Sequence, residues 1–205
     1  MRTLVGVVLD RSGSMSTILA DTIGGFNSFI DDQRRKNQDQ VYVVTQFDTE
    51  YEVRQDGVEL DDVETLTRKN FVPRGGTALL DAMGQTIASM DAQLANDKTI
   101  QQALLVVITD GEENSSKEFT REQVFDLISQ REKQGNWEFA FLGAGQDAIG
   151  QARSLGINNS QQYAANGLGA KMAFNNISRS TECYSSGGTA NLADLADASP
   201  QIDIE

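Results

Sequence analysis

Hydrophobic residues along the chain gather in four short, unbroken runs, each bounded by polar residues. The runs are rich in Val, Leu or aromatic residues and occupy positions 4–9, 41–47, 103–109 and 137–143. They do not alternate between apolar and polar residues, which is typical of strands buried on both faces of a sheet. The runs therefore predict four inner strands.

The segments between these runs place apolar residues on one face of a helix. Two stripes have this spacing: Leu19, Ile23, Phe26 and Ile30, and then Leu80, Met83, Ile87, Met90 and Leu94. Thr120 followed by Gln123 has the pattern of a capping box, which predicts that a helix begins there. Further helices are predicted over 147–155 and 168–184, with a last strand between them at 161–165.

The alternation of strands and helices predicts an α/β fold with a doubly wound, Rossmann-like sheet. We expect about six strands, mostly parallel, with helices on both faces. The polar segment from Tyr51 to Leu60 contains the turn signal Asp56-Gly57 and is predicted to be one antiparallel edge strand. From Ser185 onward Ser, Gly, Ala and Asp dominate, so we expect one domain over 1–184 and a disordered tail over 185–205.

Charge and composition narrow the classes of function. The formal net charge of −13 disfavours nucleic acids and anionic membranes as partners. There is no His and a single Cys, Cys183, which excludes His-ligated zinc, a Ser-His-Asp triad and an intrachain disulfide. No signal peptide or membrane-spanning segment is evident, so a cytoplasmic location is expected. The pattern leaves the oligomeric state open.

Three polar clusters follow a predicted strand or precede a predicted helix, at 10–14, 73–77 and 109–111. In a doubly wound sheet, ligands bind beyond the carboxyl ends of the strands. Asp48 also ends a strand, and we expect it to act as a local cap. The clusters offer hard oxygen donors, which suit Mg²⁺ or Mn²⁺ ahead of Ca²⁺ and disfavour softer metals. The candidate ligands are two carboxylates and three hydroxyls: Asp10, Ser12, Ser14, Thr77 and Asp110.

These residues resemble a known metal site. Asp10-x-Ser12-x-Ser14, then Gly-Gly-Thr at Thr77, then Thr-Asp-Gly at Asp110 is similar to the metal-ion-dependent adhesion site of von Willebrand factor A (VWA) domains. The resemblance covers roughly residues 1 to 184 and matches all five positions in order. For a single residue a local role is the alternative, such as a helix N-cap for Ser12 or a turn for Asp110.

The resemblance implies a role for each donor. Ser12 and Ser14 coordinate the metal through their hydroxyls, and Thr77 coordinates it directly in the ligand-bound state. Asp10 and Asp110 act directly or through water. The coordination sphere is left incomplete, and an Asp or Glu of a partner protein completes it. The implied function is a metal-dependent protein-binding module of the intracellular bacterial or phage type, such as an assembly factor or the partner of a ring-shaped ATPase.

Two other functions stay open. One is a Mg²⁺-dependent phosphohydrolase with Asp10 as nucleophile. Haloacid-dehalogenase-like phosphatases carry a second Asp two residues later, where this chain has Ser12, and there is no P-loop Gly-Lys-Ser/Thr. The other is a structural component whose metal only holds loops together.

Four charged residues near the predicted site are expected to form a partner-binding rim: Arg74, Asp81, Glu112 and Glu113. Each has a local alternative. Asp81 suits the first turn of a helix or the support of Thr77. Glu112 and Glu113 suit a solvated loop, and Arg74 can pair with a nearby acid.

Overall fold

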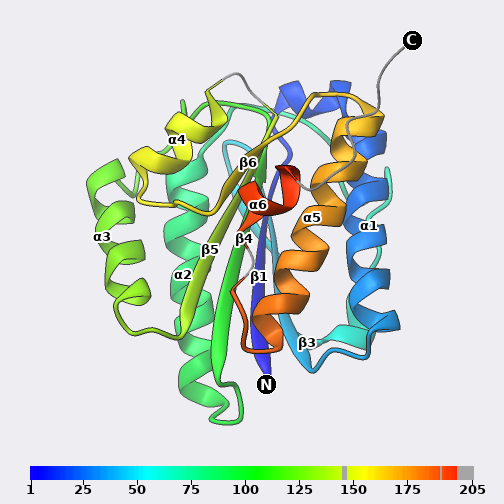
Figure 1. The fold of residues 1–205 in the computed structure, drawn as a ribbon. Coiled ribbons are helices and arrows are strands. Elements are labelled where there is room, and N and C mark those ends of the chain that lie inside the picture. The colour runs from blue at the N-terminus through cyan, green and yellow to red at the C-terminus, as the bar shows by residue number, and fades with distance from the viewer. Residues whose placement is uncertain (145–146, 190, 198–205) are drawn as a thin grey trace.

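The computed structural model describes residues 1–144, 147–189 and 191–197. Within them, the strands form one sheet in the order β3-β2-β1-β4-β5-β6 (Figure 1). The strands are β1 (Thr3–Asp10), β2 (Gln40–Phe47), β3 (Tyr51–Glu59), β4 (Gln102–Thr109), β5 (Trp137–Gly143) and β6 (Ser160–Gln162). Neighbouring strands are parallel except β2 and β3, which confirms the predicted sheet with one antiparallel edge strand.

Helices cover both faces of this sheet, as predicted. The helices are α1 (Leu19–Arg35), α2 (Leu79–Asn96), α3 (Arg121–Glu132), α4 (Ala148–Ser154), α5 (Gly167–Ser185) and α6 (Leu192–Asp197). Two short 3-10 helices are η1 (Gly13–Thr17) and η2 (Leu60–Asp62). Side chains of α1, α5 and α6 pack on one face, and those of α2, α3 and α4 pack on the other (Figure 1).

The first strand shows why its hydrophobic run is unbroken. Val5, Val7 and Leu9 belong to the core cluster on the α1 and α5 face, whereas Leu4 and Val8 belong to the cluster on the α2 face. Successive side chains of a strand point to opposite faces, so a strand covered on both sides needs an apolar residue at every position. Burying each such side chain stabilises the fold by about 1.5–3 kcal/mol.

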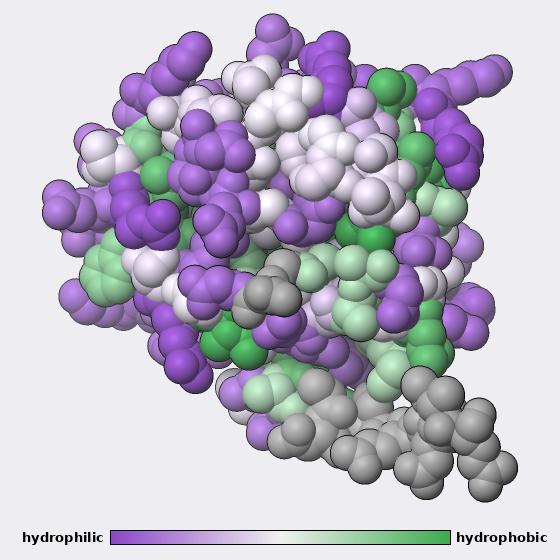
Figure 2. Space-filling view, turned by 90° about the horizontal axis from the view of Figure 1, so that it is seen from above, coloured by the Kyte–Doolittle hydropathy of each residue, from purple (hydrophilic) through white to green (hydrophobic). Residues whose placement is uncertain are grey.

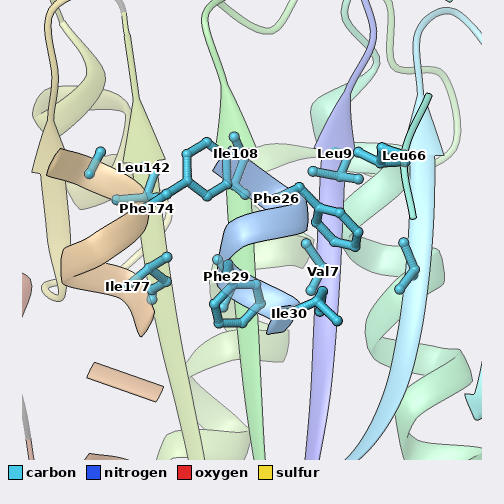
Figure 3. Packing of buried hydrophobic residues seen from close by; sticks show 14 of the residues in the cluster. Val7, Leu9, Phe26, Phe29, Ile30, Leu66, Ile108, Leu142, Phe174 and Ile177 are labelled. Carbon is cyan, nitrogen blue, oxygen red and sulfur yellow. The ribbon is translucent and has the colours of Figure 1, made fainter. Parts of the chain in front are cut away.

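Aromatic residues from two helices fill the core on the α1 face. Figure 3 shows Phe26 and Phe29 of α1 and Phe174 of α5 among the aliphatic side chains of the inner strands. All three rings are at most 2% exposed. The stripe predicted for this helix therefore faces the sheet, although Leu19 and Ile23 are only partly buried.

Side chains set where two of the helices begin. The predicted capping box is confirmed, because the Thr120 hydroxyl accepts from the Gln123 amide at 3.2 Å and the Thr120 amide donates to Gln123 Oε1 at 2.8 Å. At α5, Asn166 caps the helix by accepting from the Gly169 amide at 2.9 Å. Both caps satisfy amides that have no partner within the helix.

The order of the strands places a crevice at one end of the sheet. From β1 the chain winds outward to β2 and β3, then crosses back to β4 on the other side of β1. The connections after β1 and β4 therefore leave in opposite directions. A doubly wound sheet binds ligands at this switch point, beyond the carboxyl ends of its strands.

The structure corrects one predicted turn. Asp56-Gly57 does not reverse the chain but lies inside β3. Val58 is opposite Tyr42 and Asp56 is opposite Val43, so Gly57 is the extra residue of a β-bulge, with φ +72°. A glycine at positive φ suits such a bulge as well as it suits a turn, so the local sequence is the same for both.

Part of the segment expected to be a tail is structured. Residues 192–197 form α6, and Leu192 is fully buried in the core. The Leu192 amide donates to Asn159 Oδ1 at 2.8 Å. Residues 198–205 lie outside the described part of the chain, and the domain boundary at 184 stays a prediction.

Two adjacent glycines of α1 give a matched stability test. A Cβ at Gly24 would meet nothing within 4 Å, whereas a Cβ at Gly25 would lie 2.1 Å from the buried ring of Phe174. We expect Gly24→Ala to stabilise the fold by about 0.5–1 kcal/mol. We expect Gly25→Ala to destabilise it by about 1–3 kcal/mol through overpacking. Urea denaturation measures both, and shifts of the same sign would contradict this packing.

Candidate metal centre

The three predicted clusters meet at the carboxyl ends of the two strands on either side of the switch point. Asp10 is the last residue of β1, and Asp110 directly follows β4. Thr77 is two residues before α2 begins at Leu79. Seen from this end, the molecular surface is mostly hydrophilic, with pale areas of intermediate hydropathy among the charged groups (Figure 2).

Asp10 is the most buried of the five candidate ligands, with 0% exposure. Its Oδ1 accepts from the Ser12 amide at 2.6 Å, and its Oδ2 accepts from the Thr109 hydroxyl at 2.6 Å. These bonds join the ends of β1 and β4, although Asp10 and Thr109 are 99 residues apart in the sequence. The carboxylate is therefore held in one orientation at the end of the sheet.

The two serines and Asp110 form a chain of oxygen atoms beside it. The hydroxyls of Ser12 and Ser14 are 3.1 Å apart, and Ser14 Oγ donates to Asp110 Oδ1 at 2.7 Å. Ser12 occupies the N-cap position of η1, yet its side chain makes no capping hydrogen bond. The hydroxyl of Ser12 thus faces other oxygen donors, and the N-cap alternative does not describe it.

Thr77 completes the group around Gly111. A Cβ at Gly111 would lie 3.1 Å from Thr77 Oγ1, 3.7 Å from Ser14 Oγ and 3.8 Å from Asp10 Oδ2. One point beside Gly111 is therefore within 4 Å of three oxygens, two from the segment at 10–14 and one from the segment at 73–77. A side chain at position 111 would enter this space and press on the Thr77 hydroxyl. The donor set and the free space fit a small divalent cation that prefers oxygen ligands.

The electrostatics of the site favour a cation. Burial raises the pKa of Asp10 to about 6, against hydrogen bonds from Thr109 and Ser12 that lower it, and Asp110 raises it further. Burial likewise raises the pKa of Asp110, while the bond from Ser14 opposes that change. Among the described residues, neither carboxylate has a Lys or Arg within ion-pair distance. Two partly desolvated carboxylates thus share a site without a compensating positive charge.

The candidate site mixes acidic residues with hydroxyl residues. In the described part of the chain, no three His, Cys, Asp or Glu residues are grouped so that they could hold a metal ion. The present cluster has two carboxylates, and its other three donors are hydroxyls. Two carboxylates would at most balance the charge of a divalent cation.

Three of the four residues expected at the rim are bound to other parts of the chain. Arg74 is half-exposed and pairs with Asp48 and Glu50. Glu113 accepts from the Leu80 amide at 3.0 Å and so caps the start of α2. The carboxylate of Asp81 accepts three backbone amides of the loop after β4: those of Lys117, Glu118 and Phe119.

Glu112 differs from these three residues. It is exposed, and no hydrogen bond or ion pair of its side chain occurs within the described residues. It lines a surface hollow together with Arg121 and Asp147. Of the expected rim, Glu112 is the acid that is free to meet a partner.

Two residues that contact the ligand loops, Asn114 and Asp48, were not assigned to the site from the sequence. Asn114 Oδ1 accepts from the Thr77 amide at 2.9 Å, and the Asn114 amide donates to the Thr77 carbonyl at 3.0 Å. Asp48 accepts the nearby Glu50 amide through Oδ1 at 2.9 Å, as expected of a local cap, and its Oδ2 pairs with both Arg11 and Arg74. The position of Asp48 at the end of a predicted strand, on the same edge as Asp10, was a signal for this role.

At the level of sequence, this chain matches no family model and no curated protein. Several solved structures share its fold. The D319A mutant of the PilB minor pilin from Streptococcus sanguinis gives a TM-score of 0.66 at 16% identity, over 98% of this chain and 64% of that one. A von Willebrand factor type A structure from Catenulispora acidiphila gives 0.61 at 14% identity, over 89% and 43%. The chain has the von Willebrand factor A fold.

A third matching structure is described as manganese-loaded. The manganese-loaded TRAP protein of Plasmodium vivax gives a TM-score of 0.55 at 15% identity, over 83% of this chain and 72% of that one. The chain spans less than two thirds of the pilin and of the Catenulispora protein. At these identities the matches establish the VWA fold, and the site rests on the residues of this chain. Among the described residues, no helix is long and apolar enough to cross a membrane.

Proposed function

We propose that this chain is a metal-dependent protein-binding module. The observation that carries the proposal is a convergence of oxygens: those of Asp10, Ser14 and Thr77 lie around Gly111, and Asp110 Oδ1 accepts from the Ser14 hydroxyl at 2.7 Å. The hydroxyls of Ser12 and Thr77 cap no helix, and Thr77 Oγ1 forms no hydrogen bond with the described residues. Buried or half-buried polar groups are normally paired, so these oxygens suit an additional ligand.

Five residues would hold the cation in this proposal: Asp10, Ser12, Ser14, Thr77 and Asp110. A bound Mg²⁺ or Mn²⁺ would supply a localised positive charge that a carboxylate oxygen can approach. The manganese-loaded state of the TRAP structure supports a divalent cation for this fold. The donors are all oxygen atoms, which favours these ions over softer metals.

The residues of the chain also favour an acidic partner residue. The two carboxylates at the site would offset a divalent charge without exceeding it. The chain as a whole carries a net charge of −13, which repels acidic surfaces. An Asp or Glu of the partner would therefore bind at the metal, while the rim would select the residues around it. In this proposal Glu112 contacts the partner, and Glu113 and Asp81 hold the loop that carries Asp110.

The cellular setting expected from the sequence stays a prediction. A cytoplasmic assembly factor or ATPase partner would use the site as described, but the structural matches include a minor pilin. The proposed function depends on the metal and on the partner carboxylate, and it applies equally in either setting.

A pull-down with the immobilised chain tests the proposal. A partner captured in Mg²⁺ should be released by EDTA, and it should be lost in Thr77→Ala because one metal ligand is missing. Thr99→Ala is the matched control, since Thr99 is an exposed hydroxyl residue before β4, at the opposite end of the sheet. If the affinity of an identified partner is unchanged by EDTA and by Thr77→Ala, the metal is structural at most.

The phosphohydrolase alternative gains no support from the site. Such an enzyme needs a general acid near the nucleophile Asp10, and position 12 holds a serine whose hydroxyl contacts Ser14. An assay with an aryl phosphate and Mg²⁺ separates the two functions. Turnover that disappears in Asp10→Ala would support the enzyme and contradict the binding module.

A further inference from the structure

A buried carboxylate next to the metal centre joins two of its loops. Asp48 directly follows β2, and its side chain is 1% exposed. Its Oδ2 accepts from Arg11 Nε at 2.9 Å and from Arg74 Nε at 2.8 Å. Arg11 stands between two candidate ligands, Asp10 and Ser12, and Arg74 stands three residues before Thr77. One oxygen atom thus binds the two loops that carry four of the five ligands.

The backbone reinforces this junction. The Arg74 amide donates to the Arg11 carbonyl at 2.8 Å, and the Gly13 amide donates to the Gly75 carbonyl at 3.1 Å. Gly75 has φ +65°, and a Cβ there would lie 3.1 Å from Thr49 Oγ1, so the loop passes close to the end of β2. These short contacts keep the loop at 10–14 and the loop at 73–77 at a fixed separation.

The charges at the junction make Asp48 hard to replace. The side chain of Arg11 is 7% exposed and also binds Glu52. Burial alone would raise the pKa of Asp48, but hydrogen bonds from Arg74, the Glu50 amide and Arg11 outweigh it and lower the pKa. The carboxylate is therefore ionised at neutral pH. Without it, the buried guanidinium of Arg11 would lose its most buried acidic partner.

We infer that Asp48 is a positioning residue of the metal centre. It holds Ser12 and Ser14 in register with Thr77, without itself being a ligand. The expected effect of Asp48 on metal affinity rests on the proposed function. Its effect on the positions of the two loops does not. Residues that orient metal ligands in this way typically change metal affinity by about 10- to 100-fold when they are replaced.

The test compares Asp48→Asn with Asp91→Asn. Asp91 also pairs with an arginine, but it lies on α2 and its partner Arg131 lies on α3, so this pair does not involve the two loops. We expect Asp48→Asn to weaken Mn²⁺ binding about 10- to 100-fold by calorimetry and to change the electron paramagnetic resonance spectrum of bound Mn²⁺. Asp91→Asn should leave both unchanged. A merely structural role would lower stability without altering that spectrum.

A second measurement needs no metal. Hydrogen exchange of the metal-free protein should become faster at residues 11–14 and 73–78 in Asp48→Asn and not in Asp91→Asn. If Asp48→Asn fails to fold, Arg74→Gln takes its place. Arg74 is half-exposed, so its replacement is tolerated more easily, and the variant removes one of the two ion pairs of Asp48. It should raise exchange at the same residues and weaken Mn²⁺ binding by a smaller factor.

The outcomes separate the two proposals. If the wild-type protein binds no Mn²⁺, the proposed function is wrong, and hydrogen exchange still decides whether Asp48 holds the loops. If the wild type binds Mn²⁺ and the Asp48 variant binds it equally well, or if its loops exchange at the wild-type rate, the inference about Asp48 is wrong.

Discussion

Asp10→Ala is expected to weaken Mg²⁺ or Mn²⁺ binding by at least about 100-fold, which is the upper end of what replacing a supporting residue costs. Asp10 supplies one of the two negative charges of the site, and it links the ends of β1 and β4 through Thr109. Its loss removes a charged ligand and the orientation of its neighbours together. Isothermal titration calorimetry with MnCl₂ measures the change directly.

The Asp10 variant should remain folded. Burial raises the pKa of this carboxyl to about 6, so ionising it at pH 7 without a cation already opposes folding. Because the folded-state pKa lies above the ordinary value of 3.8, this group contributes stability at low pH that is lost as the pH rises through about 6. Replacing it with alanine removes that penalty.

A second variant and a control complete this test. Asp110→Ala removes the other carboxylate, which is half-buried and accepts from the Ser14 hydroxyl at 2.7 Å. This variant should weaken Mn²⁺ binding to a similar degree. Asp56→Asn alters an exposed acid on β3 that binds Ser89 and Gln93, and it should bind Mn²⁺ like the wild type. Wild-type affinity in both Asp10→Ala and Asp110→Ala would show that the metal is held elsewhere.

Phe26→Ala is expected to destabilise the fold by about 3–5 kcal/mol. Phe26 lies on α1 with 0% exposure, and Figure 3 shows its ring among side chains of the inner strands. Its removal leaves a cavity between α1 and the sheet that neighbouring rings cannot fill without leaving their own positions. The loss is a large part of the total stability of a domain of this size.

Phe125→Ala is the matched control for the core variant. Phe125 lies on α3 and is 43% exposed, so its truncation should cost far less than that of Phe26. Guanidinium denaturation of the two variants gives the difference in unfolding free energy. Equal losses would mean that the ring of Phe26 does not carry the packing of α1 on the sheet.

The chemistry of the candidate site can be predicted from the sequence. The residue types that bind a hard cation are local properties, as are the glycines beside them. The ends of the strands are also readable, because a strand covered on both faces needs an unbroken apolar run. Together these signals placed Asp10 and Asp110 at one edge of the sheet. The structure brings Ser14 and Asp110 within 2.7 Å, as that placement requires.

The roles of the surrounding charged residues could not be read in the same way. Glu113 was expected at the rim, yet it accepts the Leu80 amide, which lies 33 residues away in the sequence. Asp48 was expected to act as a local cap and does accept the Glu50 amide, but it also pairs with Arg11 and Arg74, which lie 37 and 26 residues away. An acid near a strand end looks the same in the sequence whether it meets solvent, an amide or a guanidinium.

The class of fold, the inner strands, the main helices and the chemistry of the candidate metal donors follow from the sequence, because each depends on a periodic pattern or on a residue type. Only the tertiary structure decided the order of the strands, the bulge at Gly57 and the docking of α6 through Leu192. It also decided that Asp48 joins the two metal loops. These features depend on contacts between segments far apart in the chain, and such contacts form only when the sheet brings the segments together.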